Sequence, residues 1–415
     1  MNLNYPIQDV RAQFPSLQRM HLGKPAVYFD GPGGSQTLGS AIKAMSDYLQ
    51  NGVANIHGYS PTSHETEAIL AKAREDLAVL FQAKPTEIAF GPNATSLMFA
   101  VARALSKTWE PGDEIILSEL DHHAHVDSWL TAAQDHAVTV KWIPVDTQRL
   151  TLDLSALSSL IGPKTKLVAI GAASNCIGTI TDITEVARLA KTVGALVSVD
   201  AVHAIPHIPL DMQNMNLDFI FTSAYKCFAA HVGMAAIRED IFQSLPIYKV
   251  APAPDYYPDI LEMGTQNYEG LATIPCTVDF FANLGTGDDL RSKLISGYAQ
   301  IEAHENHLAN IIRTEFAKIP EITLYQADDT TPKTPTIAFR IAGITNEDFC
   351  TRMCAEYSIF ISSGDFYAKT LMEKLGIRAS GSIIRAGLAP YNTTEEVERF
   401  IQATREIIAS HSSDN

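Results

Sequence analysis

A lysine and an aspartate whose types suit imine chemistry with a bound ligand stand at the ends of two apolar segments in the middle of the chain. Lys226 ends residues 217–226, and Asp200 ends residues 195–200. The apolar approach to Lys226 predicts a partly desolvated ammonium group, whose pKa falls and whose neutral amine then forms imines. A solvated loop lysine is the alternative, because most lysines are exposed. If both segments are parallel strands, the amine and the carboxylate face one ligand at the carboxyl ends of the strands.

The stretch Gly-Pro-Asn-Ala-Thr-Ser at residues 91–96 leads into an apolar helix expected over residues 97–105. A helix start offers free N–H groups and the positive end of the helix dipole, and small hydroxyl residues let an anion approach. We therefore expect an anion site at Ala94 and Thr95. An ordinary helix cap is the alternative interpretation.

Three further side chains follow strand-like segments, namely His122, Asn175 and His203. Pyridoxal phosphate requires such a set of groups: helix N–H groups and hydroxyls for its phosphate, a carboxylate for its pyridinium nitrogen, a flat partner for its ring and a lysine for its aldehyde. The order of these groups along the chain predicts a pyridoxal-phosphate site.

The elements that position these groups alternate between strand and helix from residue 86 to residue 237. The strands are nearly continuous apolar runs, which predicts an α/β fold with a mainly parallel central sheet and helices on both faces. The segment 233–237 is expected to close this sheet. A tight turn near a ligand or a plain surface turn is expected at residues 31–35, which read Gly-Pro-Gly-Gly-Ser.

A long helix expected over residues 290–316 leads into a smaller region of α+β character. Its strands are expected at 336–339, 359–362 and 382–388, and its helices at 346–356 and 394–408. The predicted domains are an N-terminal segment that packs with the small domain (1–25), a large cofactor-binding α/β domain (26–285) and a small α+β C-terminal domain (286–415).

The chain has 415 residues, 46% of them hydrophobic, and a formal net charge of −16. This charge argues against nucleic acid and anionic membranes as partners, because both repel it. No apolar run reaches the ~18 residues that span a bilayer, and residues 1–6 lack the features of a secretory signal. We expect a cytoplasmic protein with five reduced cysteines and no metal site.

The chain resembles the class V aminotransferase group of fold-type I pyridoxal-phosphate enzymes, and it is most similar to the cysteine desulfurase and selenocysteine lyase branch. The resemblance runs from Tyr-Phe-Asp at residues 28–30 to Arg-Ala-Gly-Leu-Ala-Pro-Tyr-Asn at residues 385–392. It implies a fold-type I transferase fold, pyridoxal 5'-phosphate as cofactor and an amino acid as substrate.

By this resemblance Lys226 binds the cofactor aldehyde, Asp200 pairs with the pyridine nitrogen, and His122 stacks on the ring and shuttles protons. The other implied cofactor contacts are Ala94, Thr95, Asn175, His203, Ser223, Tyr225 and Thr265. Arg385 is implied to bind the substrate carboxylate as a bidentate fork, beside Asn175.

Thr265 lies in the segment Glu-Met-Gly-Thr at residues 262–265, which in the family reaches the phosphate of the neighbouring subunit. A homodimer with shared active sites is therefore implied. His203 stands where the family usually has glutamine, and Tyr225 stands where it has histidine. Both side chains are still able to hydrogen-bond to the cofactor.

A more consequential departure lies in the loop before the Arg385 strand. Desulfurases carry a cysteine there that accepts sulfur as a persulfide, whereas residues 362–368 read Ser-Ser-Gly-Asp-Phe-Tyr-Ala, with Tyr367 or a neighbour at that place. A phenol with a pKa of about 10 does not replace a thiolate nucleophile. Asp365 either contacts a substrate side chain or caps a turn. The side chains expected to contact the substrate side chain are His57, Tyr59, Asp365 and Tyr367.

We therefore expect a C–S or C–Se lyase that works by β-elimination without a persulfide on the protein. Lys226 removes the Cα proton, and a thiol, persulfide or selenide leaves from Cβ. Transamination or epimerisation is the alternative. A catalytically silent pyridoxal-phosphate-binding protein is a third interpretation.

Overall fold

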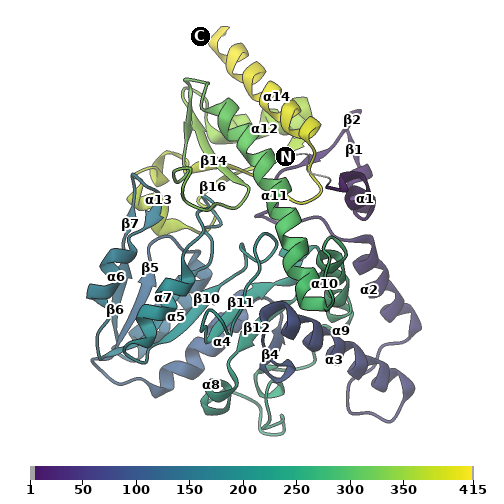
Figure 1. Cartoon of the computed structure of the whole chain (residues 1–415), viewed down its shortest axis with the longest axis vertical. Helices are drawn as coiled ribbons and strands as arrows, with labels where there is room; N and C mark the ends of the chain where they lie inside the picture. The colour runs from purple at the N-terminus through teal and green to yellow at the C-terminus, as the bar shows by residue number, and fades with distance from the viewer. Residues whose placement is uncertain (1–4, 414–415) are drawn as a thin grey trace.

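The computed structural model describes residues 5–413, so the expected N-terminal segment 1–25 is seen only from residue 5. Its largest element is a seven-stranded sheet with the strand order β4-β12-β11-β10-β9-β5-β6 (Figure 1). These strands are β4 (Ile88–Gly91), β5 (Glu114–Ser118), β6 (Thr139–Ile143), β9 (Thr165–Gly171), β10 (Leu196–Asp200), β11 (Phe219–Ser223) and β12 (Gly233–Ile237). All pairs from β6 to β11 are parallel, as the sequence predicts.

Strand β12 is antiparallel to both of its neighbours, β11 and β4. The expectation that residues 233–237 close the sheet is therefore wrong, because β4 forms that edge. A short connection after β11 makes β12 an antiparallel neighbour. The outer side of β12 then pairs with β4, which precedes both strands in the chain.

Two hydrophobic cores lie on opposite faces of the large sheet. Successive side chains of a strand point to opposite faces, so Ile115 and Leu117 enter one core and Ile116 enters the other. The helices that pack on the first face are α4 (Ala94–Leu105), α5 (His123–Asp135) and α8 (Glu239–Ser244). Those on the second face are α3 (Pro61–Phe81), α6 (Leu154–Leu160), α7 (Ile183–Lys191) and α10 (Ile274–Asn283).

A second, four-stranded antiparallel sheet has the strand order β13-β14-β17-β16. Its strands are β13 (Ile322–Leu324), β14 (Thr336–Ile341), β16 (Ser362–Gly364) and β17 (Ile383–Gly387). It shares a core with α11 (Leu290–Phe316), α12 (Asn346–Tyr357) and α14 (Thr394–Ser413). In Figure 1 the green helix α11 runs from the large sheet to the small sheet and so connects the two.

The single strand expected over residues 359–362 is divided in the structure. Strand β15 (Ile359–Phe360) pairs in parallel with β3 (Val27–Tyr28), whereas β16 pairs with β17. The chain passes from one partner to the other at Ile361, so one continuous strand is not possible. The remaining helices and strands are α1 (Ile7–Ala12), β1 (Met20–His21), β2 (Lys24–Pro25), α2 (Gly39–Asn51), β7 (Val145–Asp146), β8 (Thr151–Leu152), α9 (Tyr268–Leu271) and α13 (Lys369–Lys374).

The turn after β3 is fixed to the end of β17. The N–H of Gly387 donates to the carbonyl of Phe29 at 2.7 Å, and the N–H of Gly31 donates to the carbonyl of Gly387 at 3.2 Å. A Cβ atom at position 387 would lie 2.1 Å from the Cδ of Pro32, so only glycine allows this approach. Among residues 5–413 no helix has the length and apolar composition needed to cross a bilayer.

Candidate active site

One cavity of about 300 Å³ lies where β9, β10 and β11 end, between the large and small sheets. Ten of the eleven predicted site residues line it: Ala94, Thr95, His122, Asn175, Asp200, His203, Ser223, Tyr225, Lys226 and Arg385. Thr265 is exposed and does not line this cavity. Of the side chains expected to select the substrate, Tyr367 lines the cavity, whereas His57 and Tyr59 are exposed and do not.

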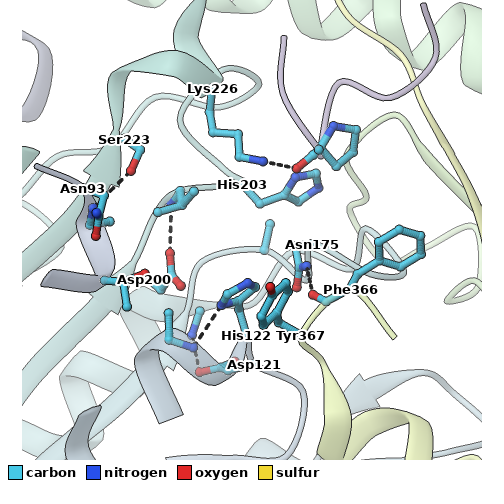
Figure 2. A pocket seen from close by; sticks show the side chains of 18 of the residues that line it. Asn93, Asp121, His122, Asn175, Asp200, His203, Ser223, Lys226, Phe366 and Tyr367 are labelled. Atoms are coloured by element: carbon cyan, nitrogen blue, oxygen red, sulfur yellow. Dashed lines mark hydrogen bonds between the residues drawn. The ribbon is translucent and has the colours of Figure 1, made fainter. Parts of the chain in front are cut away.

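Lys226 lies on a short 3-10 turn that follows β11, and it is only 8% exposed. Burial, and then the positive charge of Arg385, lower the pKa of Lys226 to about 8. Its Nζ donates a hydrogen bond to the carbonyl of Pro32, in the turn fixed to β17 (Figure 2). A substantial share of this amine is therefore neutral near physiological pH.

Asp200 ends β10 and is buried. The N–H of Val202 donates to its Oδ1 at 2.9 Å, and within residues 5–413 no hydrogen bond reaches its Oδ2. Burial raises the pKa of Asp200, and the nearby imidazoles His125 and His122 partly counter this effect. A cationic N–H placed in the cavity against the free oxygen would hold this carboxylate ionised.

His122 is the residue just before α5, and its Nδ1 accepts a hydrogen bond from the N–H of Ala124 at 3.0 Å. This contact places the proton of the neutral ring on Nε2. Burial lowers the pKa of His122, so the neutral form prevails. The ring stacks on Tyr367, with centroids 5.2 Å apart and 26° between the planes.

The predicted anion site lies at the start of α4. The side chain of Asn93 caps the helix by accepting from the N–H of Ser96 at 2.8 Å, so the alternative interpretation as a helix cap is confirmed, and the anion site stays a prediction. The N–H of Ala94 donates to Oγ of Ser223 at 3.2 Å, which brings these two predicted phosphate contacts together. A Cβ atom at Gly233 would lie 2.3 Å from the carbonyl carbon of Asn93. The start of α4 is therefore able to approach β12 this closely because residue 233 is glycine.

Arg385 already makes two hydrogen bonds within the described residues, and its bidentate contact with a substrate carboxylate stays a prediction. Its Nη1 donates to the carbonyl of Asn175 at 2.9 Å, and its Nη2 donates to Oδ1 of Asp30 at 3.2 Å. The buried Nε has no partner within residues 5–413, and the ring of Phe366 covers the guanidinium at 3.7 Å. The Nε–H and the second N–H of each Nη are therefore the groups that remain for a carboxylate in the cavity.

The two residues that depart from the family pattern make contacts of their own. The Nε2 of His203 lies 3.0 Å and 3.1 Å from the hydroxyls of Thr334 and Thr336, at the start of β14. Burial lowers the pKa of His203 well below its usual range. Tyr225 stacks on His231, with ring centroids 4.5 Å apart. Their contacts with a cofactor stay predictions.

The loop at residues 365–368 covers the cavity from the side of the small sheet. Two consecutive residues in it, Phe366 and Tyr367, have positive φ angles of 49° and 60°, which bulky side chains seldom adopt. The carbonyl of Phe366 accepts from Nδ2 of Asn175, and that of Tyr367 accepts from the N–H of His123, both at 2.8 Å. Asp365 accepts from the N–H of Tyr367 at 3.0 Å, so it caps the turn. These bonds hold the strained loop against the large sheet.

Three contributors to the site were missed in the sequence: the Asp30 carboxylate, the Pro32 carbonyl and the Phe366 ring. The sequence of residues 31–35 indicates only a turn that lies either near a ligand or at the surface. The turn does lie at the ligand cavity, since Pro32 and Gly33 line it. An aspartate directly before a glycine-rich turn was the one available signal.

The residues around the cavity fit pyridoxal phosphate. The amine of Lys226 has a lowered pKa, the buried carboxylate of Asp200 has one oxygen without a hydrogen bond from residues 5–413, and a helix start with hydroxyl groups also lines the cavity. Asn175 also carries a buried Oδ1 without a partner among the described residues. When bound, this cofactor supplies an aldehyde for the amino group and an electron-withdrawing ring. Fold and site together define a fold-type I pyridoxal-phosphate-dependent enzyme.

The family model for aminotransferase class-V matches residues 27–400, so the chain belongs to this family. The chain is 28% identical to a cysteine desulfurase of Pectobacterium atrosepticum, with 98% of each chain covered. It is 30% identical to the aminotransferase-like protein FGM3 of Gibberella zeae, with 98% of this chain and 99% of that protein covered.

Among solved structures, the cysteine desulfurase CsdA of Escherichia coli, determined in its S-sulfonic acid form, matches with a TM-score of 0.85. The sequences are 26% identical, and the match covers 98% of this chain and 99% of that chain. The chain is therefore a cysteine desulfurase-like enzyme of the class V aminotransferase family that depends on pyridoxal 5'-phosphate.

Proposed function

We propose that this enzyme cleaves the Cβ–S or Cβ–Se bond of an amino acid by β-elimination, without a persulfide on the protein. One observation carries this proposal: none of the five cysteines, all of which the structure describes, lines the cavity. Tyr367 stands at the cavity in the loop where a sulfur-accepting thiol is expected.

The cysteines nearest to the site in sequence are unsuited to nucleophilic attack. Burial raises the pKa of Cys176 to about 12, and it also raises the pKa of Cys227, next to Lys226. Thiols of this kind carry almost no thiolate near neutral pH. Sulfur leaving the substrate therefore finds no acceptor on this chain at the cavity.

We assign the chemical step to Lys226. Its Nζ takes the proton when the Cα–H bond of the substrate breaks. The Cβ–S bond then breaks, and sulfur leaves with both bonding electrons and takes a proton from solvent. The released 2-aminoacrylate reacts with water to give pyruvate and ammonia.

The remaining predicted residues hold the reactants. Asp200 would pair with a pyridinium N–H, and His122 would offer a flat neutral ring for stacking. The start of α4, with Thr95 and Ser223, takes the phosphate. Arg385 binds the substrate carboxylate through the N–H groups that Asp30 and Asn175 leave free. The stacking role rests on the ring geometry of His122, and the phosphate role rests on the helix dipole.

We also infer a cytoplasmic homodimer. The exposed position of Thr265, away from the cavity of its own chain, supports the assignment of this residue to the partner's phosphate. The separate hydrophobic core around α11, α12 and α14 supports the proposed small domain at residues 286–415. The proposed segment 1–25 and large domain 26–285 complete this division.

Product analysis tests the proposed reaction. The purified holoenzyme is incubated with cysteine, cystine and selenocysteine in turn, and pyruvate, alanine, ammonia and released thiol or selenide are measured. Stoichiometric pyruvate and ammonia are expected. Alanine together with a persulfide on the protein would show desulfuration instead and would overturn the proposal.

Transamination is the second candidate, because a relative of 30% identity is named an aminotransferase-like protein. Its signature is a keto acid that forms only when an amino acceptor is added. Loss of chirality at Cα without a keto acid would indicate epimerisation. A bound chromophore without turnover of any amino acid would indicate a silent cofactor-binding protein.

A further inference from the structure

We propose that Asp30 is the resident counter-ion of Arg385, and that it weakens the binding of carboxylates at this arginine, so that acids without an amino group do not occupy the site. Asp30 follows β3, 355 residues from Arg385 in the chain. The inference rests on the proposed role of Arg385 as the carboxylate site, and it holds whichever reaction follows.

The guanidinium of Arg385 needs a partner when no substrate is present. Its side chain is 3% exposed, and the described residues provide one carboxylate within ion-pair distance, that of Asp30 at 3.2 Å. An unpaired charge at such a depth is strongly unfavourable. Asp30 therefore compensates the positive charge while the cavity waits for its ligand.

Asp30 is held in place for this contact. The hydroxyl of Ser362, in β16, donates to its Oδ2 at 2.8 Å, while its Oδ1 accepts from Arg385. The backbone of Asp30 forms a bridge to Gly387, two residues after the arginine. Strand and turn thus fix the distance between the two charges.

A ligand carboxylate that reaches Arg385 comes close to the carboxylate of Asp30. This like-charge contact weakens the binding of every carboxylate, whatever else the ligand carries. An amino acid also has an amino group, which gains the imine bond to the cofactor. A simple carboxylic acid gains no such bond, so Asp30 lowers its occupancy of the site.

The probe is propionate, which has a carboxylate and no amino group. Its dissociation constant is measured by calorimetric titration of the holoenzyme, for the wild type and for Asp30→Asn, Ser362→Ala and Arg385→Gln. We expect Asp30→Asn to bind propionate about tenfold more tightly or better, because asparagine keeps the shape and removes the charge. Ser362→Ala keeps the charge, so no tightening is expected.

Equal or weaker binding of propionate to Asp30→Asn would overturn the inference and leave Asp30 a structural anchor. If Asp30→Asn does not fold, Asp30→Ser is used for the same comparison. Arg385→Gln is expected to abolish propionate binding. Retained binding would show that Arg385 is not the carboxylate site, and this would overturn the inference. Pyruvate formation from cystine is a separate assay, so a failed lyase proposal does not alter the outcome of this titration.

Discussion

The imidazole of His122 and the phenol of Tyr367 stack at 5.2 Å, with 26° between the ring planes. Tyr367 thus lies against one face of the histidine ring, and both side chains line the cavity. The tyrosine comes from the loop in which the resemblance to desulfurases implies a sulfur acceptor. In this chain the loop holds an aromatic side chain that stacks on the histidine.

Replacing Tyr367 separates the effect of its ring from that of its hydroxyl. Tyr367→Phe keeps the stack on His122, so KM and kcat should stay close to those of the wild type. Tyr367→Ala removes a stacking contact of about 0.5–1.5 kcal/mol, which should raise KM by up to about tenfold. Steady-state kinetics of both variants check this. A large loss of kcat in Tyr367→Phe would show that the hydroxyl takes part in proton transfer.

Lys226→Ala should abolish covalent attachment of the cofactor. After borohydride reduction, mass spectrometry should find a pyridoxyl group on residue 226 in the wild type and none in the variant. Lys293→Ala, at an exposed lysine of α11, is the matched control and should label like the wild type. Undiminished labelling of Lys226→Ala would place the Schiff base on another lysine.

The lowered pKa of Lys226 predicts how cofactor uptake depends on pH. Only the neutral amine attacks an aldehyde, so the uptake rate of the apoenzyme should rise about tenfold per pH unit below about 8 and level off above it. Stopped-flow absorbance follows this reaction. Because Arg385 lowers the pKa of Lys226, Arg385→Gln should move the inflection to higher pH. An inflection near the value of a free lysine would contradict the assignment.

Asp200→Asn removes the carboxylate that faces the proposed pyridinium N–H. The loss of this charge should lower kcat on the order of a hundredfold or more, as for other electrostatic contacts to a developing charge. The far-ultraviolet circular dichroism spectrum should stay unchanged, because asparagine fills the same space. Activity within a few-fold of the wild type would exclude a role for Asp200 in the reaction.

Gly233→Ala tests the close approach of β12 to the start of α4. The added Cβ would lie 2.3 Å from the carbonyl carbon of Asn93, so backbone must shift at the proposed phosphate site. We expect a loss of about 1–3 kcal/mol in the free energy of unfolding and weaker cofactor binding. Gly162→Ala, where a Cβ meets no atom within 4 Å, should change neither quantity. Thermal unfolding with and without cofactor measures both.

The sequence predicted the parts of the site that local pattern determines. Asp200 ends β10 and Lys226 lies in the turn that follows the adjacent parallel strand β11, and the apolar runs before them were sufficient to place both groups at one edge of the sheet. Helix α11 was predicted with the bounds that the structure has, because its helical pattern is long and continuous.

The missed contributors depend on contacts between distant segments. Asp30 meets Arg385 across 355 residues, and Phe366 reaches the arginine through a backbone conformation with positive φ. No periodicity signals either contact. The division of residues 359–364 into β15 and β16 is not predicted for the same reason. Strand β15 pairs with β3, whereas β16 pairs with β17, and both pairings join distant segments.

The close contact between Gly387 and Pro32 joins two functions that lie far apart in the chain. The turn whose Pro32 carbonyl accepts from Lys226 and the strand that carries Arg385 are joined by backbone hydrogen bonds and by this close contact. Any hinge rotation of the small sheet would carry both together. Opening the cavity to admit a substrate would thus release the lysine from its resting acceptor in the same movement that withdraws the arginine.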